Sequence, residues 1–310
     1  MCIRDSFKTW QLFAICVVVW GTTWHAITYQ LFDFSAEVGV ALRFALAGVA
    51  VLALCRWRGV PLACSLADHG ALALQGVFLY GVSYVCVYHA ERFVPSGLVA
   101  VGYSASPLLA GIGAALLFGA ALSRRFVLGG VLGVSGVVVI FWTEITRASG
   151  GERAALGALL TVAAVLLSAV GSLVASRNRK RGVALLPAMG FGMLYGAIAA
   201  AVVALAFGRG VALPTAPSWW LSLAYLAFAG SVLTFACFLT LQDRVGVGAA
   251  GTVGVMTPLL ALLVSIAFEG FRPDVLTAAG AGLAVAGNAL MLIPARSDRR
   301  PAPAGAREAG

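Results

Sequence analysis

The sequence predicts an all-α integral membrane protein with ten transmembrane helices arranged as two inverted five-helix repeats. Composition, helix-length apolar segments and an internal repeat lead to this prediction. Of 310 residues, 61% are hydrophobic and 11% are charged, and the mean hydropathy is +0.97. Soluble domains carry about 25% charged residues. A single water-soluble core cannot bury so much apolar surface, so we expect a multi-pass protein of the cell (inner) membrane.

The internal repeat is a unit of about five apolar helices that occurs twice, about 151 residues apart. Residues 91–137 align with residues 242–288 without a gap. An odd number of crossings in each unit inverts the second copy in the membrane, which is the architecture of many secondary transporters. The matched pairs include Gly97 and Gly248, Pro107 and Pro258, Gly119 and Gly270, Ser83 and Thr234, and Tyr84 and Phe235.

Ten segments approach the roughly 20 apolar residues that cross a bilayer as a helix. They are residues 10–31, 36–55, 70–89, 96–119, 127–143, 156–176, 184–207, 218–241, 247–268 and 275–294. The predicted organisation is a cytoplasmic flank at 1–9, a first repeat at 10–143, an external linker at 144–155, a second repeat at 156–294 and a disordered cytoplasmic tail at 295–310. Residues 1–6 fit nothing around them and are either a short flank or sequence foreign to the gene.

Lysine and arginine placement predicts the orientation. With a cytoplasmic N-terminus, the inner loops hold 15 of the 21 Lys and Arg residues and the outer loops hold 5. The densest group, Arg177 to Arg181, then lies in the cytoplasmic connection between helices six and seven. Both termini are therefore expected in the cytoplasm.

Charge and cysteine patterns argue against several other classes. The net charge of +9 comes from short loops between apolar segments, so it indicates membrane orientation and no nucleic-acid partner. The six cysteines form no C-x-x-C pair, and we expect no disulfide, metal or cofactor. No G-x-x-x-x-G-K-[ST] motif is present, so ATP-driven transport within this chain is not expected. The expected partners are a small-molecule substrate and membrane lipid.

Several motifs also resemble the EamA-type members of the drug/metabolite transporter superfamily. They are W-G-T-T-W at 20–24, Arg43-Phe44, residues 90–109 and the second copy at 241–270. The resemblance covers nearly all of residues 10–294 and implies ten helices, a central substrate pathway and movement of small metabolites such as amino acids, often outward. The sequence departs from the family pattern at Gln242-Asp243-Arg244, and at Thr23, Trp24 and His25, so the resemblance implies no particular substrate.

The matched prolines are candidate structural kinks. Pro107 and Pro258 fall near the middle of the predicted helices four and nine. A proline frees the carbonyl group four residues earlier, and a broken helix within a membrane can line a cavity or pack on protein. A simple packing kink is the alternative. The polar residues near the two prolines that could line a pathway are Tyr103, Ser106, Thr252 and Thr257.

Helix one carries a polar stripe at Thr22, His25 and Tyr29, and a neighbouring pair at Trp20 and Trp24. Spacing of i, i+3 and i+7 places the polar residues on one helix face. A titratable residue within a membrane helix is a functional candidate. The alternative for His25 is a neutral imidazole that bonds to a neighbouring helix.

Arg43 lies inside helix two, about 10 Å deep by helical rise. A central arginine costs about 2.5–3.5 kcal/mol on insertion, so it needs carbonyl groups, a water-filled pathway or an anionic substrate group. A substrate carboxylate would suit its forked guanidinium. The alternative is that Arg43 extends to the outer interface.

Helix three carries Tyr80, Tyr84 and Tyr88 at spacing i, i+4 and i+8. This aromatic stripe forms a binding wall or simple packing, and Tyr88 is expected in the interfacial aromatic belt. Gln75 could line the cytoplasmic half of a pathway. If the stripe binds substrate, the site is weighted toward helices one to four.

Glycine faces are predicted on helices five and ten. Small residues allow close helix approach in lipid. These faces serve internal packing or a possible homodimer. Their members are Gly129, Gly133, Gly136, Gly280, Gly282 and Gly287.

The leading hypothesis is a secondary transporter, an exporter, of a small organic metabolite such as an amino acid, by alternating access between the repeats. The alternatives are an integral membrane enzyme that modifies lipid and a non-transporting scaffold; an enzyme would need a clustered catalytic set, which the sequence lacks. All Asp and Glu residues fall at predicted helix ends or in loops, which favours facilitated or weakly coupled movement. The candidate pathway residues are Trp20, Thr22, Trp24, His25, Arg43, Tyr80, Tyr84, Tyr103, Ser106, Thr252 and Thr257.

Overall fold

The computed structural model describes residues 7–31, 34–119, 122–146, 151–208 and 214–292. The described residues form helices and short connections, without a strand among them. The predictions about residues 1–6 and about the tail at 295–310 lie outside this part of the chain. Within it, nine helices are long and apolar enough to cross a membrane, and a further apolar helix, α13, has 17 residues.

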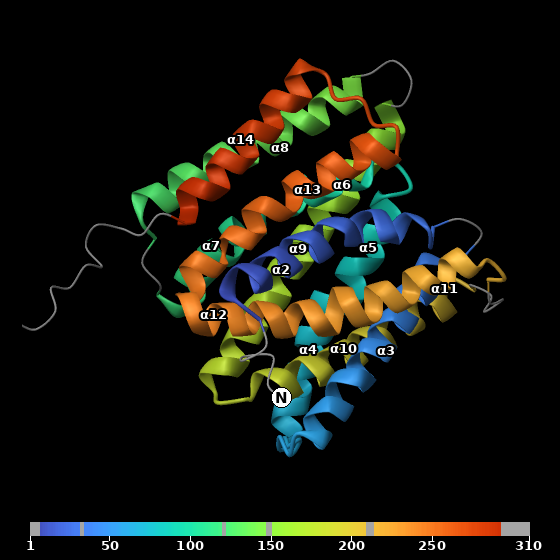
Figure 1. The fold of residues 1–310 in the computed structure, drawn as a ribbon, viewed down its shortest axis with the longest axis vertical. Helices are drawn as coiled ribbons and strands as arrows, with labels where there is room; N and C mark the ends of the chain where they lie inside the picture. Colours follow the sequence, from blue (N-terminus) through green and yellow to red (C-terminus); the bar gives the residue numbers. More distant parts are fainter. Residues whose placement is uncertain (1–6, 32–33, 120–121, 147–150, 209–213, 293–310) are drawn as a thin grey trace, which may run out of the picture.

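The helices follow the predicted segments closely, with the exceptions noted below (Figure 1). The first half comprises α2 (Thr9–Thr28), α3 (Ala36–Trp57), α4 (Leu66–Gly76), η1 (Val77–Val82), α5 (Ser83–Ala90), α6 (Ser96–Tyr103), α7 (Ser106–Phe118) and α8 (Arg124–Thr146). The second half comprises α9 (Gly151–Lys180), α10 (Leu185–Ala206), α11 (Pro217–Ala224), η2 (Tyr225–Leu233), α12 (Thr234–Ala250), α13 (Thr252–Phe268) and α14 (Val275–Leu292).

Helix four, which comprises α6 and α7, and helix nine, which is α13, end in the same way. Gly119 follows α7 with φ 66°, and Gly270 follows α13 with φ 67°. Left-handed backbone of this kind terminates helices and is adopted without strain by glycine. This backbone conformation explains why both repeats have glycine at this position.

Helices four and nine differ at their matched prolines. In helix four the chain breaks between α6 and α7, and Pro107 stands in the first turn of α7. In helix nine, α13 continues through Pro258. The break in the second half falls earlier, at Gly251, because α12 extends to Ala250 through the loop predicted at residues 242–246. Pro107 therefore stands at an interruption, whereas Pro258 lies inside a continuous helix, where a kink stays a prediction.

Helices three and eight share a feature that the sequence reading missed. Each contains a π-helical segment, η1 in one and η2 in the other, directly before Tyr84 and Phe235. The 151-residue offset carries Val77–Val82 onto residues 228–233, inside η2. A π-helical turn changes the direction of the side chains that follow it and is frequent at functional sites.

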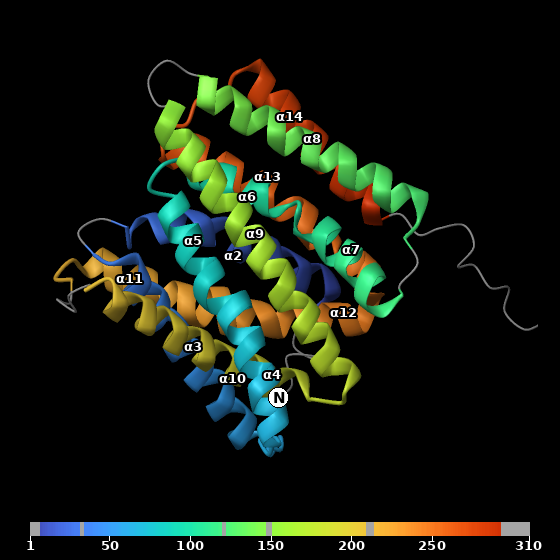
Figure 2. The same ribbon diagram turned by 180° about the vertical axis from the view of Figure 1, so that it is seen from behind.

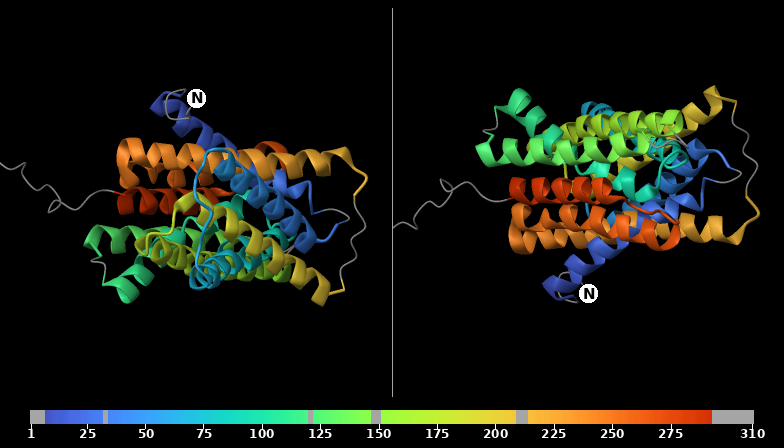
Figure 3. Two further views of the ribbon diagram at one scale, coloured as in Figure 1. Left: turned by 90° about the horizontal axis from the view of Figure 1, so that it is seen from below. Right: turned by 90° about the horizontal axis from the view of Figure 1, so that it is seen from above.

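Equivalent helices of the two halves pack against each other. The contacting pairs are α3 with α10, α6 with α13, and α8 with α14. Figure 1 and Figure 2 show α8 and α14 side by side at one edge of the bundle, and Figure 3 shows α9 on the α8 side and α13 on the α14 side.

The glycine faces form the contact between α8 and α14. A Cβ atom on Gly136 would collide with the Gly280 carbonyl oxygen, and one on Gly287 would collide with the backbone of Gly129 and Gly133. Close approach of two helix backbones requires residues without side chains. These glycines serve internal packing, whereas a Cβ on Gly282 would meet nothing within 4 Å.

Two minor expectations are wrong. Tyr88 is fully buried and donates a hydrogen bond to Gln30 Oε1 at 3.0 Å, so it does not lie in an interfacial belt. His69 falls between the predicted segments 36–55 and 70–89 and is therefore expected in a loop, but it lies in α4, where its Nδ1 is 3.0 Å from the Tyr195 hydroxyl.

Candidate functional site

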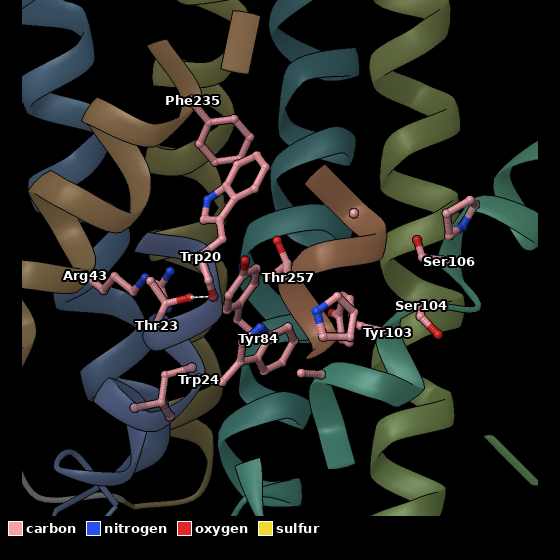
Figure 4. A pocket seen from close by; sticks show the side chains of 15 residues that line it. Trp20, Thr23, Trp24, Arg43, Tyr84, Tyr103, Ser104, Ser106, Phe235 and Thr257 are labelled. Carbon is pink, nitrogen blue, oxygen red and sulfur yellow. Dashed lines mark hydrogen bonds between the residues drawn. The ribbon is translucent and has the colours of Figure 1, made fainter. Parts of the chain in front are cut away.

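A cavity of about 290 Å³ lies in the centre of the helix bundle (Figure 4). Most of its lining comes from the first half of the chain, as expected for a site weighted toward helices one to four. The lining residues are Trp20, Thr23, Trp24, Ile27, Arg43, Tyr84, Ala100, Tyr103, Ser104, Ser106, Pro107, Phe235, Gly254, Thr257 and Pro258.

Helix one presents a single face to the cavity. Trp20, Thr23, Trp24 and Ile27 follow the spacing i, i+3, i+4 and i+7, which aligns them along one side of α2. The predicted polar stripe through Thr22 lies on another side of the helix. The tryptophan pair was therefore the better guide to the face that lines the cavity.

Trp20 is held in place from the second half of the chain. Its Nε1 donates to the Gly230 carbonyl oxygen at 3.1 Å, within the π-helical segment η2. Its ring packs edge-on against Phe235, with centroids 5.2 Å apart, and against Phe238 at 5.1 Å. A tryptophan with a satisfied N–H and packed neighbours provides a rigid apolar wall.

Arg43 is the charged residue of the cavity wall. It is 3% exposed, and its Nε and Nη1 atoms have no hydrogen-bond partner among the described residues. The guanidinium carbon lies 4.9 Å from the Tyr84 ring centroid and 5.1 Å from that of Phe44. Aromatic faces stabilise a cation but do not supply hydrogen-bond acceptors for its N–H groups. Arg43 does not extend to the outer surface, so that alternative is wrong.

The opposite wall combines an interrupted helix with hydroxyl groups. Tyr103 ends α6, its ring centroid 5.3 Å from that of Trp24, and its hydroxyl lies 3.2 Å from Ser168 Oγ. Ser104 Oγ is buried and has no partner among the described residues. Figure 4 shows Ser104 and Ser106 together at the break in helix four. The cavity thus joins an aromatic body, unpaired guanidinium donors and hydroxyl groups.

Four predicted pathway residues lie outside this cavity. The Thr22 hydroxyl is 2.6 Å from the Tyr225 hydroxyl and also donates to the Val18 carbonyl oxygen. His25 belongs to a separate polar network, and Thr252 is exposed at the start of α13. Tyr80 is buried and lines a second cavity. These four residues do not line the central cavity, and their place in a substrate pathway stays a prediction.

The polar network of His25 connects three helices. The His25 Nδ1 atom of α2 lies 3.0 Å from Glu269 Oε1, which follows α13. Ser96, at the start of α6, donates its N–H to Glu269 Oε2 at 3.0 Å and its hydroxyl to Oε1. Gly97 N–H donates to Ser265 Oγ at 2.8 Å. These bonds join α2, the start of α6 and the end of α13.

The second cavity has a volume of about 430 Å³ and lies between helices three, six, seven and eight. Gln75 and Arg179 are among its polar lining residues, so the suggestion that Gln75 lines a pathway agrees with its position. Tyr84 and Phe235 line both this cavity and the central one. Two residues related by the internal repeat therefore stand between the two cavities.

Several lining residues were missed from the sequence, although signals for some of them existed. Thr23 and Ile27 continue the i, i+3, i+4, i+7 pattern that begins at Trp20. Phe235 is the repeat partner of Tyr84. Ala100 and Gly254 carry no chemical signal, because they line the cavity only by leaving space.

One known protein family matches both halves of the chain. The profile described as the EamA-like transporter family matches residues 8–142 and again residues 155–293. The chain belongs to the EamA-like transporter family. It is a multi-pass membrane protein of a transporter family, as the resemblance implied.

Individual relatives of this EamA-like protein agree with the family. The chain is 29% identical over 270 residues to the uncharacterized inner membrane transporter YedA of Escherichia coli (strain K12), covering 84% of this chain and 82% of YedA. It is 27% identical over 231 residues to the uncharacterized transporter YetK of Bacillus subtilis (strain 168), covering 72% and 68%. A solved crystal structure with 22% identity has a TM-score of 0.65 and covers 90% of this chain and 94% of the other, which shows a shared fold.

Proposed function

We propose that this EamA-like protein is a secondary transporter of small organic metabolites that carry a carboxylate and an apolar body, such as an amino acid. The observation that carries the proposal is the central cavity, where an aromatic wall meets the unpaired Nε and Nη1 atoms of Arg43. Ligand sites are mostly apolar cavities with a few placed polar groups. A carboxylate would supply the acceptors that the buried guanidinium lacks.

The cost of burying Arg43 supports this assignment. An unpaired buried charge is strongly unfavourable, and a purely structural arginine would be expected to have its N–H groups satisfied by carbonyl oxygens. Arg43 instead leaves two nitrogens unpaired beside an open volume. The proposed partner of these nitrogens is a substrate carboxylate that enters the cavity.

Alternating access between two inverted repeats, residues 10–143 and 156–294, is the proposed mechanism. Pairing of equivalent helices supports two halves that rock against each other. The His25–Glu269–Ser96 bonds close one end of the cavity, and Tyr84 with Phe235 separates it from the second cavity. We assign the first group to the outer closure and the aromatic pair to the inner one.

The orientation in the membrane is part of the proposal. The uneven distribution of Lys and Arg between alternate loops supports an orientation with both termini in the cytoplasm. The second cavity, with Arg179 in its wall, then opens toward the cytoplasm. With an outward substrate gradient, net movement is export.

Reconstitution into liposomes tests the proposal. Purified protein is assayed for counterflow of labelled amino acids, aromatic carboxylates, nucleosides and polyamines, without ATP. Saturable counterflow of a carboxylate-bearing compound, competed by its unlabelled form, is expected. Counterflow of polyamines alone would contradict the assignment of Arg43, and no counterflow of any class would contradict transport.

A further inference from the structure

A second buried ionisable residue lies near Arg43 and takes no part in the cavity wall. Glu91 follows α5 and is 8% exposed, and neither oxygen of its carboxyl group has a hydrogen-bond partner among the described residues. A buried carboxylate without donors would forfeit its hydration without compensation. A carboxyl group in that position is expected to hold a proton.

The surroundings of Glu91 agree with a protonated state. Burial raises the pKa of the Glu91 carboxyl well above its ordinary value, the Glu269 carboxylate raises it further, and the Arg43 guanidinium lowers it. Glu269 accepts hydrogen bonds from the backbone and hydroxyl of Ser96 and contacts His25. Of these two carboxyl groups, Glu269 therefore has the donors that stabilise an anion, and Glu91 has none.

The other charged and titratable groups around this site are engaged elsewhere or neutral. Arg92 donates from Nη2 to the Phe34 carbonyl oxygen at 2.9 Å. The Tyr88 hydroxyl donates to Gln30 and also faces the Arg43 guanidinium, and as a hydrogen-bond donor it is neutral. Glu37 lies 2.9 Å from His89 Nε2. Arg43 is thus the cation that an ionised Glu91 would attract.

We infer that Glu91 is a proton-binding site that is linked to anion binding at Arg43, an inference that rests on the proposed function. When Glu91 holds a proton, the unpaired nitrogens of Arg43 are available to a substrate carboxylate in the cavity. When Glu91 loses its proton, its carboxylate competes for the same guanidinium. Anion binding and proton binding therefore favour each other, because linkage between two sites is reciprocal.

This linkage revises the expectation of facilitated or weakly coupled movement that the sequence suggested. The sequence places Glu91 at a predicted helix end, which hides that its side chain is buried within the electrostatic influence of Arg43. A carrier that binds an anion and a proton together moves both in the same direction. An inward proton gradient then favours uptake of the substrate and opposes its export.

Titration calorimetry of the full-length protein in detergent measures the linkage directly. The probe is indole-3-acetate, which stays anionic from about pH 6 to about pH 9 because carboxylic acids ionise well below that range. Binding is measured in buffers of different ionisation enthalpy, which gives the number of protons taken up. The control is Glu37→Gln, a second buried glutamate.

With wild-type protein and Glu37→Gln, we expect no proton uptake at low pH, uptake that approaches one proton at high pH, and affinity that falls on the order of 5- to 150-fold across the range. Glu91→Gln should bind without proton uptake at any pH. Binding without proton uptake in the wild type across the range, or uptake that persists in Glu91→Gln, overturns the inference and leaves the proposed function standing. Absence of all binding of carboxylate probes by the wild type contradicts the proposed function itself.

An infrared measurement keeps the inference testable if Glu91→Gln does not fold. A protonated carboxyl group has a carbonyl band that an ionised one lacks. The ligand-free wild type, titrated upward in pH, should lose such a band, and Glu91→Asp should shift it. A spectrum with no protonated-carboxyl band at any pH in that range overturns the inference.

Discussion

The imidazole of His25 and the carboxylate of Glu269 lie 3.0 Å apart, although 244 residues separate them in the sequence. His25 belongs to the first helix of one repeat, and Glu269 follows the fourth helix of the other. The histidine expected either to line a substrate pathway or to bond to a neighbouring helix does the second. Its partner is a residue that also anchors the start of α6.

Replacing His25 with Ala should weaken the outer closure. A hydrogen bond to a charged group contributes about 1.5–3 kcal/mol, and His25→Ala removes one from Glu269 while Ser96 remains. Thermal unfolding should occur at lower temperature, and labelling of a cysteine introduced at Ser106 in the cavity wall should become faster from the outer side. His69→Ala, which removes a histidine of α4 that pairs with Tyr195 and lines neither cavity, is the control and should leave outer labelling unchanged. Equal labelling rates in both variants would contradict the closure.

Replacing Arg43 with Lys should weaken binding of carboxylates and spare neutral ligands. The charge remains, but the fork that can donate two parallel hydrogen bonds is lost. We expect affinity for an aromatic carboxylate to fall on the order of 10- to 100-fold, equivalent to about 1.5–3 kcal/mol. The matching alcohol should bind equally to both proteins. Normal carboxylate affinity in Arg43→Lys would show that the guanidinium does not recognise the anion.

Alanine substitutions at two glycines of α14 should have different effects on stability, because one glycine lies at the contact with α8 and the other does not. Gly287→Ala places a Cβ atom against the backbone of Gly129 and Gly133, whereas Gly282→Ala meets nothing within 4 Å. We expect Gly287→Ala to lower stability by about 1–3 kcal/mol, the usual cost of overpacking. Gly282→Ala should be neutral. Thermal unfolding in detergent measures both, and equal effects would argue against the close approach of the two helices.

The pH dependence of stability should reveal Glu91. Its pKa is raised in the folded protein by burial, so above the ordinary glutamate range the unfolded chain releases its proton first. The contribution of Glu91 to stability is then fully present at low pH and decreases as pH rises toward the folded-state pKa, by up to about 1.4 kcal/mol for each pH unit. Glu91→Gln should remove this slope from the unfolding temperature measured across pH. An identical slope in wild type and variant would show that Glu91 is not responsible.

Some of this organisation is readable from the sequence. The length of the apolar segments predicts the helices. The 151-residue offset pairs Gly119 with Gly270, and both glycines terminate a helix with left-handed backbone. Trp20, Trp24 and Arg43 line the cavity. They could be predicted as candidates because a bulky or charged side chain within a membrane helix is conspicuous in the sequence. These features depend on local geometry or on the energetics of a single side chain.

Other features required the three-dimensional structure. The π-helical segments η1 and η2 change the direction of the following side chains, and period-based reading assumes a regular helix. Glu91 and Glu269 both stand at helix ends, where sequence reading expects solvated carboxylates. Tertiary packing buries Glu91 without hydrogen-bond donors among the described residues, whereas Glu269 accepts hydrogen bonds from Ser96.

Thiol accessibility of the cavity tests the central claim, that substrate crosses the membrane through this cavity by alternating access. Ser106→Cys is introduced into a cysteine-free background, reconstituted, and exposed to a membrane-impermeant reagent from either side of the liposome. We predict labelling from both sides, with protection by a transported carboxylate and no such protection by a polyamine. Labelling from one side only, under all substrate conditions, would contradict the account.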